Sequence, residues 1–390
     1  MAPLRAEPVA ILAGGVATPI GLDVDAFWSG LLAGGDGVSA IERFPTGDLR
    51  VGRGGEIKKL PPVALGIRSR AVGLLVAAAT DLRTRAPLTA PAERVAVVVG
   101  TALGGVEELE HALGDDAGVL RARDALYDSP AHALAAWLGA RGPVLTVSSA
   151  CASGATALGI GADLLLDDGA DVVVAGGYDI LCRFVMRGFD ALRSLTRERV
   201  RPFDRRRSGL LLGEAAGLVL LARERDSGGR RLGRLLGHGS ASDASHIAAP
   251  DREGRGLETA IRAALAAAGV AGGEVDFVSA HGTATPLNDR IETAVLRRVL
   301  GARAASVPVN SIKGSLGHTM GAAATLEAIM CLLAARDGLI PPTVGYEEPD
   351  PECDLDYVAG ACRAARPRLM LSTSLGFGGC NAALVLEGAG

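Results

Sequence analysis

One cysteine occupies a position where a strand turns into a helix. Residues 143–147 form an apolar, β-branched run typical of a short buried strand, and residues 152–166 are rich in Ala, Leu and Ile, as in a helix. Cys151 lies between them, among small residues that leave room for a substrate. The unpaired N–H groups and positive partial charge of a helix N-terminus favour a thiolate. Cys151 is therefore a candidate nucleophile, and a buried core cysteine is the alternative.

Two histidines follow strand-like segments in glycine-rich loops. His281 comes directly after the apolar run 277–279, and His318 ends the segment 310–318, just before a helix. The carboxyl ends of strands are where α/β folds gather their active sites. A lone histidine is more often structural, but two of them in such loops, with a cysteine in a third, indicate one site. The other four histidines lie in no such setting: His111, His132, His238 and His246.

The elements that carry these loops alternate between buried strands and helices in both halves of the chain. This alternation predicts an α/β fold whose sheets are covered by helices on both faces. A polar, glycine-containing break at 223–231 predicts a division into residues 1–228, with the cysteine, and residues 229–390, with both histidines. The similar last strands of the two halves, 217–221 and 382–386, indicate an internal duplication.

The composition narrows the class of protein. With 40 basic and 44 acidic residues in 390, the formal net charge of −4 predicts no general attraction to nucleic acid or to a membrane. Six cysteines are scattered without a CxxC pair, which argues against a zinc site and for a reducing compartment. The apolar runs are far shorter than the roughly 20 residues that a membrane span needs, and the N-terminus lacks a secretory signal. We expect a cytoplasmic protein without a metal.

Five motifs in order along the chain resemble those of the β-ketoacyl synthases, the decarboxylating condensing enzymes of the thiolase-like superfamily. The resemblance covers residues 9–386 and implies a five-layer αβαβα fold made of two duplicated halves with mixed sheets. The length of the chain is similar to that of the discrete, type II enzymes. The motifs are Ser149 to Gly154, Arg201-Pro202-Phe203-Asp204 followed by Gly213-Glu214, His281 to Pro286, Lys313 to His318, and Gly376 to Asn381.

The chemistry of these residues suits carbon–carbon bond formation. A thiolate at Cys151 attacks an acyl thioester and holds the acyl group as a new thioester. Neutral imidazoles at His281 and His318 donate hydrogen bonds to a malonyl thioester carbonyl and stabilise the enolate that forms as carbon dioxide leaves. The resemblance implies an oxyanion hole from the backbone N–H groups of Cys151 and Phe377. It also implies a supporting network of three further residues: Lys313, Asp289 and Glu327.

The resemblance also implies how substrates arrive. Thr283 and Thr285 match the pair that holds a phosphopantetheine arm in this family, and no other cofactor is implied. Phe377 resembles the aromatic gate between the acyl and malonyl sites, and the flanking glycines let that loop move. Acidic acyl carrier proteins are the expected partners, and a basic docking patch would steer them to the site. Its candidate residues are Arg68, Arg70 and Arg206, although structural pairs with nearby acids are the alternative.

Other functions fit parts of the sequence. A chain-length-determining partner subunit of a ketosynthase heterodimer is one alternative, but such subunits typically lack the nucleophile that Cys151 supplies. A non-decarboxylating thiolase or a Cys-His-Asn starter-unit synthase is another, and His318 speaks against both. Two departures from the family pattern stand out: the segment 247–250 lacks a hydroxyl residue that relatives often carry there, and Cys380 replaces the usual threonine. The family dimerises through the strand near Leu145, so a homodimer or heterodimer is expected, in either fatty acid or polyketide synthesis.

Overall fold

The computed structural model describes residues 7–61, 69–114, 124–229 and 231–389. Arg68 therefore lies outside the described residues. Five strands of the N-terminal half lie in the order β1-β7-β6-β4-β5, in which β4 is parallel to β5 and β6, and β7 is antiparallel to both of its neighbours. These strands are β1 (Val9–Ala17), β4 (Val95–Gly100), β5 (Val144–Val147), β6 (Val172–Asp179) and β7 (Ala215–Arg223).

The C-terminal half repeats this arrangement. Its strands lie in the order β8-β15-β14-β9-β10, with β9 parallel to β10 and β14 and with β15 antiparallel to both neighbours. The same order and the same strand directions in both halves agree with the predicted duplication. The strands are β8 (Gly233–Ser242), β9 (Phe277–Ser279), β10 (Pro308–Asn310), β14 (Leu369–Gly376) and β15 (Cys380–Gly388), with the short β12 (Asp356–Tyr357) outside β10.

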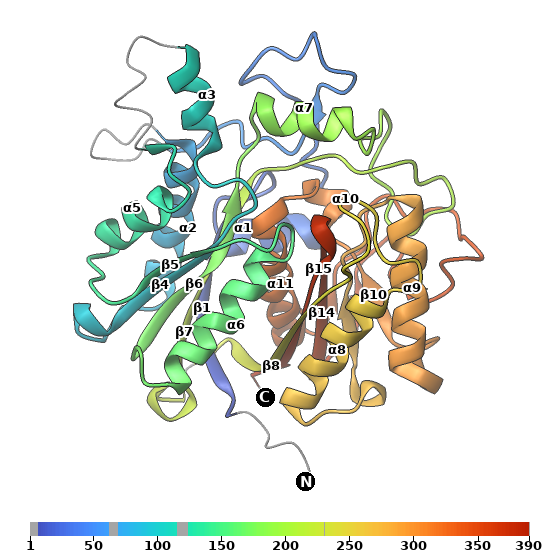
Figure 1. Ribbon diagram of the computed structural model, residues 1–390. Coiled ribbons are helices and arrows are strands. Elements are labelled where there is room, and N and C mark those ends of the chain that lie inside the picture. The colour runs from blue at the N-terminus through green and yellow to red at the C-terminus, as the bar shows by residue number, and fades with distance from the viewer. Residues whose placement is uncertain (1–6, 62–68, 115–123, 230, 390) are drawn as a thin grey trace.

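The two halves share one sheet. Residues 9–11 of β1 pair antiparallel with residues 233–235 of β8, so the strands form a single 11-stranded sheet. The predicted break at 223–231 lies in the connection from β7 to β8, the two strands that flank β1 in this sheet. Figure 1 shows the blue-to-green half and the yellow-to-red half side by side.

Helices form three layers around the strands. Two central helices, α6 (Ser153–Leu166) and α11 (Ala323–Asp337), contact strands of both halves and each other. Every residue from Ala323 to Ala334 is buried, as expected for a helix that is apolar on all sides. The outer layers are α2 (Arg70–Arg85) with α5 (Ser129–Leu138), and α8 (Arg255–Ala268) with α9 (Pro286–Leu300). The two halves of the shared sheet join at β1 and β8 and lie on either side of the central helices, so they form two β layers between three helix layers, as in the predicted five-layer αβαβα fold.

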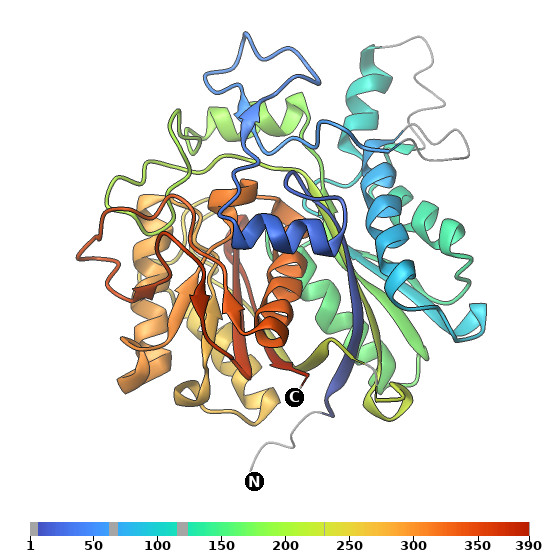
Figure 2. The ribbon, with the colours of Figure 1, turned by 180° about the vertical axis from the view of Figure 1, so that it is seen from behind.

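The remaining elements lie at the surface or in connections. Figure 2 shows α1 (Val24–Leu32) lying across the back of the molecule, where Trp28 donates a hydrogen bond to Asp337 at the end of α11. None of the described helices is long and apolar enough to cross a membrane. The other short elements are β2 (Ser39–Ala40), β3 (Arg53–Gly54), α3 (Val106–Gly114), α7 (Arg183–Ala191), α10 (Lys313–Leu316), β11 (Leu339–Ile340) and β13 (Arg363–Ala364), together with 3-10 helices at Ala92–Arg94, Glu224–Asp226, Gly272–Glu274, Gly301–Arg303, Met320–Ala322 and Phe377–Gly379.

One prediction about the strands is wrong. The strand before Cys151, β5, is not buried, because it lies at the end of the sheet and, among the described residues, pairs only with β4. Its residues are partly exposed, and Leu145 keeps 38% of its surface accessible. At the other end of the sheet, β12 covers the outer edge of β10. The edge of β5 is therefore available for pairing with another chain.

Candidate active site

The carboxyl ends of the parallel strands in both halves surround one cavity. It has a volume of about 390 Å³, and its walls include Cys151, His281, His318 and Phe377. Cys151 follows β5, His281 follows β9, His318 follows β10 and Phe377 follows β14. The structure therefore brings together the three residues predicted to do chemistry and the predicted gate.

The loop that carries Cys151 is a tight turn between β5 and α6. Ala150 has a left-handed backbone conformation (φ 51°), which is strained for a residue with a side chain. The turn is held by the Ser153 hydroxyl, which accepts a hydrogen bond from the Ser149 N–H at 3.0 Å. Ser149 and Thr156 hydroxyls lie 2.7 Å apart and tie the turn to the first turn of α6. The Cys151 side chain is thereby fixed at the cavity wall.

The prediction of a ready thiolate is wrong for the free protein. Burial raises the pKa of Cys151 to about 12, whereas the positive charge of Lys313 and the backbone N–H groups of Phe377 and Cys151 lower it. The helix N-terminus helps the thiolate, but the cost of removing a charge from water is larger here. In the free protein the thiol is therefore protonated at neutral pH.

The two histidines lie edge to face and are neutral. Their ring centroids are 5.2 Å apart at an interplanar angle of 86°. Burial, followed by the positive charge of Lys313, holds the pKa of His281 and of His318 well below the ordinary value. Nδ1 of His318 accepts the Met320 N–H at 3.4 Å, which leaves the ring proton on Nε2. His318 is thus a hydrogen-bond donor at Nε2.

A glutamate that the sequence analysis missed holds the His281 loop. Glu292 accepts the backbone N–H groups of His281 at 2.7 Å and of Gly282 at 2.8 Å, and the Thr373 hydroxyl at 2.7 Å. The carboxyl is completely buried, and burial raises its pKa. The sequence feature that could have indicated Glu292 is its position three residues after Asp289, on the same face of α9.

Lys313 and Glu327 form a buried pair. Lys313 Nζ lies 2.6 Å from Glu327 Oε1, and both side chains are at least 98% buried. Burial raises the pKa of Glu327, and the charge of Lys313 opposes this rise. The pair lies behind the histidines, and its lysine charge reaches both of them and Cys151.

The contacts of Asp289 differ from the predicted network. Its Oδ2 accepts the Phe203 N–H at 2.7 Å, and its Oδ1 accepts the Asn288 amide at 3.1 Å. Phe203 has a left-handed conformation (φ 62°), and its ring lies directly against Gly282. Asp289 therefore supports the Phe203 turn beneath the His281 loop and does not join the Lys313–Glu327 pair.

Three further residues singled out in the sequence, Thr283, Thr285 and Phe377, line the same cavity. The hydroxyls of Thr283 and Thr285 are 3.0 Å apart and both residues line the cavity. Phe377 stacks on Phe189, with ring centroids 5.4 Å apart. Gly378 adopts a left-handed conformation (φ 79°), which a glycine accommodates without strain.

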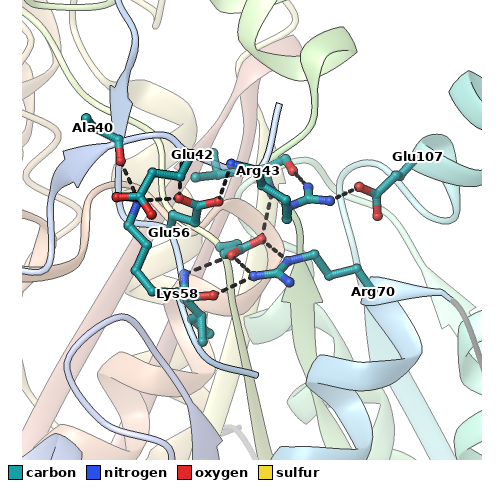
Figure 3. Close-up of polar contacts among 10 residues, drawn as sticks. Ala40, Glu42, Arg43, Glu56, Lys58, Arg70 and Glu107 are labelled. Atoms are coloured by element: carbon teal, nitrogen blue, oxygen red, sulfur yellow. Dashed lines mark hydrogen bonds and ion pairs between the residues drawn. The ribbon is translucent and has the colours of Figure 1, made fainter. Parts of the chain in front are cut away.

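The two predicted docking arginines that the structure describes, Arg70 and Arg206, are engaged in internal contacts. Arg70 Nε donates to Glu214 at 2.8 Å, so its prediction as a docking residue is wrong: the guanidinium neutralises a fully buried carboxylate. Figure 3 shows Arg70 within a cluster of polar contacts that also contains Arg43, Glu56 and Lys58.

Arg206 is half-exposed, but its charge is compensated. It pairs with Glu347 at 2.6 Å and with Glu348 at 3.2 Å. The alternative of a structural pair with nearby acids therefore holds for this residue, which lies in the arginine-rich run 197–207. A different arginine lines the cavity: Arg193, an exposed residue that follows α7 and has a φ of 55°. Its only signal in the sequence is its place just before that run.

Among the described residues, no group of three or more histidine, cysteine, aspartate or glutamate side chains is arranged to hold a metal ion.

Two family models match the chain: the N-terminal domain of β-ketoacyl synthases over residues 6–227 and the C-terminal domain over residues 232–347.

Curated relatives align over nearly the whole chain. The tetracenomycin polyketide synthase ketoacyl synthase alpha subunit of Streptomyces glaucescens is 38% identical over 98% of this chain and 97% of its own length. The 3-oxoacyl-[acyl-carrier-protein] synthase 2 of Synechocystis sp. is 33% identical over 99% of both chains. Among solved structures, the ishigamide ketosynthase/chain length factor matches with a TM-score of 0.92 and 34% identity, over 99% of this chain and 100% of that one.

Proposed function

The chain belongs to the β-ketoacyl synthase family, and we propose that it condenses a Cys151-bound acyl group with malonyl-acyl carrier protein, with loss of carbon dioxide. The observation that carries the proposal is a thiol and two neutral histidines on the wall of one cavity. The product is a β-ketoacyl-acyl carrier protein, in fatty acid or polyketide synthesis of the discrete, type II kind.

The first step is thioester exchange. The sulfur of Cys151 attacks the carbonyl of an acyl thioester, the carbon–sulfur bond to the pantetheine breaks, and the thiol proton of Cys151 goes to the departing sulfur. The backbone N–H groups of Cys151 and Phe377 both interact with the thiol, which supports their role as donors to the oxyanion that forms beside it. The acyl group is then held on Cys151.

The second step forms the carbon–carbon bond. His281 and His318 donate hydrogen bonds to the malonyl thioester carbonyl, and the enolate forms as the carboxylate leaves as carbon dioxide. The enolate carbon attacks the acyl carbonyl, the bond to Cys151 breaks, and the cysteine takes up a proton. This step needs a hydrogen-bond donor that does not lose its proton to the enolate, and a neutral imidazole meets that need. The Lys313–Glu327 pair and Glu292 support the two histidines.

Substrates reach the cavity on an acyl carrier protein. Thr283 and Thr285 hold the phosphopantetheine arm from the cavity wall, and Arg193 at the same cavity attracts the acidic carrier. The proposed reaction needs no cofactor beyond this arm. The partially exposed edge of β5 supports a dimer with a second copy or with a chain-length-determining subunit. The cytoplasmic location stays a prediction.

Intact-mass measurement after incubation with acyl carrier proteins of varied chain length tests the proposal. We expect one acyl mass on wild-type protein, located at Cys151, and a β-ketoacyl product once malonyl-carrier protein is added. Cys151→Ala should lose both, whereas Cys362→Ala, a change at an exposed cysteine, should keep both. Turnover in Cys151→Ala, or an acyl group at another residue, would contradict the proposal. A wild-type protein that never loads would favour a chain-length-determining subunit.

A further inference from the structure

A buried aspartate joins the two halves of the chain beside the cavity. Asp179 ends β6 and is completely buried. Its Oδ2 accepts the N–H groups of Gly321 at 2.6 Å and of Ala102 at 2.8 Å. Its Oδ1 accepts the Thr101 hydroxyl at 2.7 Å and the Leu103 N–H at 3.1 Å. One carboxylate thus binds the loop after β4 and the loop after β10.

On the C-terminal side, this contact fixes the turn that orients His318. Met320, next to Gly321, has a left-handed conformation (φ 49°), and its N–H points at Nδ1 of His318. A Cβ on residue 321 would lie 2.7 Å from the Asp179 carboxylate, so glycine is needed for this approach. The hydrogen bond from Gly321 therefore holds the strained turn in which Met320 selects the tautomer of His318.

On the N-terminal side, the contact continues to the Cys151 turn. The Ser153 hydroxyl lies 2.5 Å from the Ala150 carbonyl and 3.2 Å from the Thr101 carbonyl, and it accepts the Ser149 N–H at 3.0 Å. The Tyr127 hydroxyl lies 3.0 Å from the Thr101 carbonyl and 2.9 Å from the Ser148 hydroxyl. Displacing Thr101 would therefore displace the turn that presents the nucleophile.

The charge of Asp179 is unusual for a structural group. Its four hydrogen-bond donors are neutral: three backbone N–H groups and one hydroxyl. Burying a carboxylate without a cation is costly, and a neutral side chain could close a purely structural contact at lower cost. A carboxylate oxygen, however, can accept hydrogen bonds from two N–H groups at once. Here the two groups belong to loops that follow different strands.

We propose that Asp179 is a positioning residue that sets the His318 turn in register with the Cys151 turn. This inference rests on the proposed condensation, since it assigns to the carboxylate the alignment of the enolate donor with the acyl-bearing sulfur. Small displacements at such a site cost up to about 100-fold in rate, because the reacting atoms must meet at a near-attack distance.

Asp179→Asn tests the proposal, with Asp81→Asn as the matched control. Asp81, on the outer helix α2, is also a buried aspartate that accepts two backbone N–H groups, from Val16 and Val24, but unlike Asp179 it pairs with an arginine, Arg85, at 2.9 Å. Acyl loading of Cys151 is measured by intact mass. Carbon dioxide release is then measured with the acyl-loaded enzyme at varied malonyl-carrier protein.

In Asp179→Asn, we expect kcat for carbon dioxide release to fall about 10- to 100-fold, with KM for the carrier protein within about threefold of wild type. Acyl loading should fall less. Asp81→Asn should lower the unfolding midpoint and leave both steps unchanged in the folded protein. Equal losses in the two aspartate variants, or unchanged carbon dioxide release in folded Asp179→Asn, would overturn the proposal.

Two further measurements keep the proposal testable. If Asp179→Asn does not fold, Thr101→Val removes one donor, and carbon dioxide release should fall by about three- to tenfold; an unchanged rate would overturn the proposal. The ¹⁵N resonances of the His318 ring do not depend on the reaction. They should shift in Asp179→Asn and stay in place in Asp81→Asn, and a wild-type spectrum in Asp179→Asn would refute the positioning role even if the proposed condensation itself failed.

Discussion

The two halves of the chain place different side chains at equivalent strand ends. β5 and β10 occupy the same place in their halves, and each is followed by a loop and a central helix. The first loop carries Cys151, and the second carries His318. β6 and β14 also occupy equivalent places in the two halves. β6 ends at Asp179, whereas β14 ends next to Phe377.

The comparison shows how duplication can give two unlike groups to one site. Pseudo-symmetric loops from the two halves line the same cavity, so the proposed nucleophile from one half shares it with the proposed hydrogen-bond donors from the other. Divergence of a few loop residues is sufficient, because the shared sheet and the central helices α6 and α11 keep the two strand ends in place. The buried charges also differ between the halves, and this difference can be tested.

The largest effect is expected when the substitution of a buried cation at the site is compared with the substitution of a buried cation far from it. Lys313→Met removes the partner of Glu327 and the charge that favours the Cys151 thiolate and the neutral histidines. We expect condensation to fall about 100-fold, with a loss of about 3 kcal/mol in the free energy of unfolding. Turnover by the folded fraction and urea unfolding measure the two effects.

Arg223→Met is the control in the N-terminal half. Arg223 is the last residue of β7 and lies at the strand ends that are far from the cavity. It pairs with Asp171 at 2.6 Å. It should lower stability and leave turnover of the folded protein unchanged. Equal turnover in the two variants would mean that the lysine charge has no role beyond folding.

The sequence predicts the site better than it predicts the site's supports. Cys151, His281 and His318 are recognisable because each follows an apolar strand, the cysteine in a loop of small residues and the histidines in glycine-rich loops, which is a local pattern. Asp179 binds the N–H group of Gly321, 142 residues away, and Glu292 binds N–H groups in the loop between β9 and α9; both sets of partners follow from how the chain folds. The raised pKa of Cys151 was missed for a related reason: the helix N-terminus is visible in the sequence, whereas the depth of burial is not.

The two halves also contribute differently to the pH dependence of stability. Burial raises the pKa of Asp179 to about 6 and that of Asp289 to about 7, from the ordinary value of 3.8. The folded chain then binds these protons more tightly than the unfolded chain does. Their contribution to stability is complete below about pH 4 and is lost as the pH rises through each folded pKa.

Asp289→Asn should therefore remove more of this dependence than Asp179→Asn. Between pH 5 and pH 8 we expect the free energy of unfolding of wild type to fall more than that of the variant, by about 2 kcal/mol for Asp289 and about 1 kcal/mol for Asp179. Urea unfolding at pH 5, 6, 7 and 8 measures the slopes. Parallel slopes for wild type and both variants would show that neither carboxyl titrates in this range.

The smallest expected effect concerns the outer edges of the two halves. β12 covers the edge of β10, whereas no strand of the described residues pairs with the outer edge of β5. Leu145, 38% exposed on β5, should therefore lie in a dimer interface. Leu145→Lys is expected to raise the dimer dissociation constant at least about tenfold, which corresponds to about 1.4 kcal/mol, as measured by sedimentation.

Leu166→Lys provides the matched control, since Leu166 is 37% exposed and lies at the end of α6 instead of on β5. Its dissociation constant should equal that of wild type. If Leu145→Lys and wild type dimerise equally, the open edge of β5 is not the interface. If wild type is monomeric alone and dimerises only with a second, different subunit, the same pair of variants, mixed with that subunit, locates the contact. In either case the asymmetry between β5 and β10 decides which half of a duplicated sheet recruits a partner.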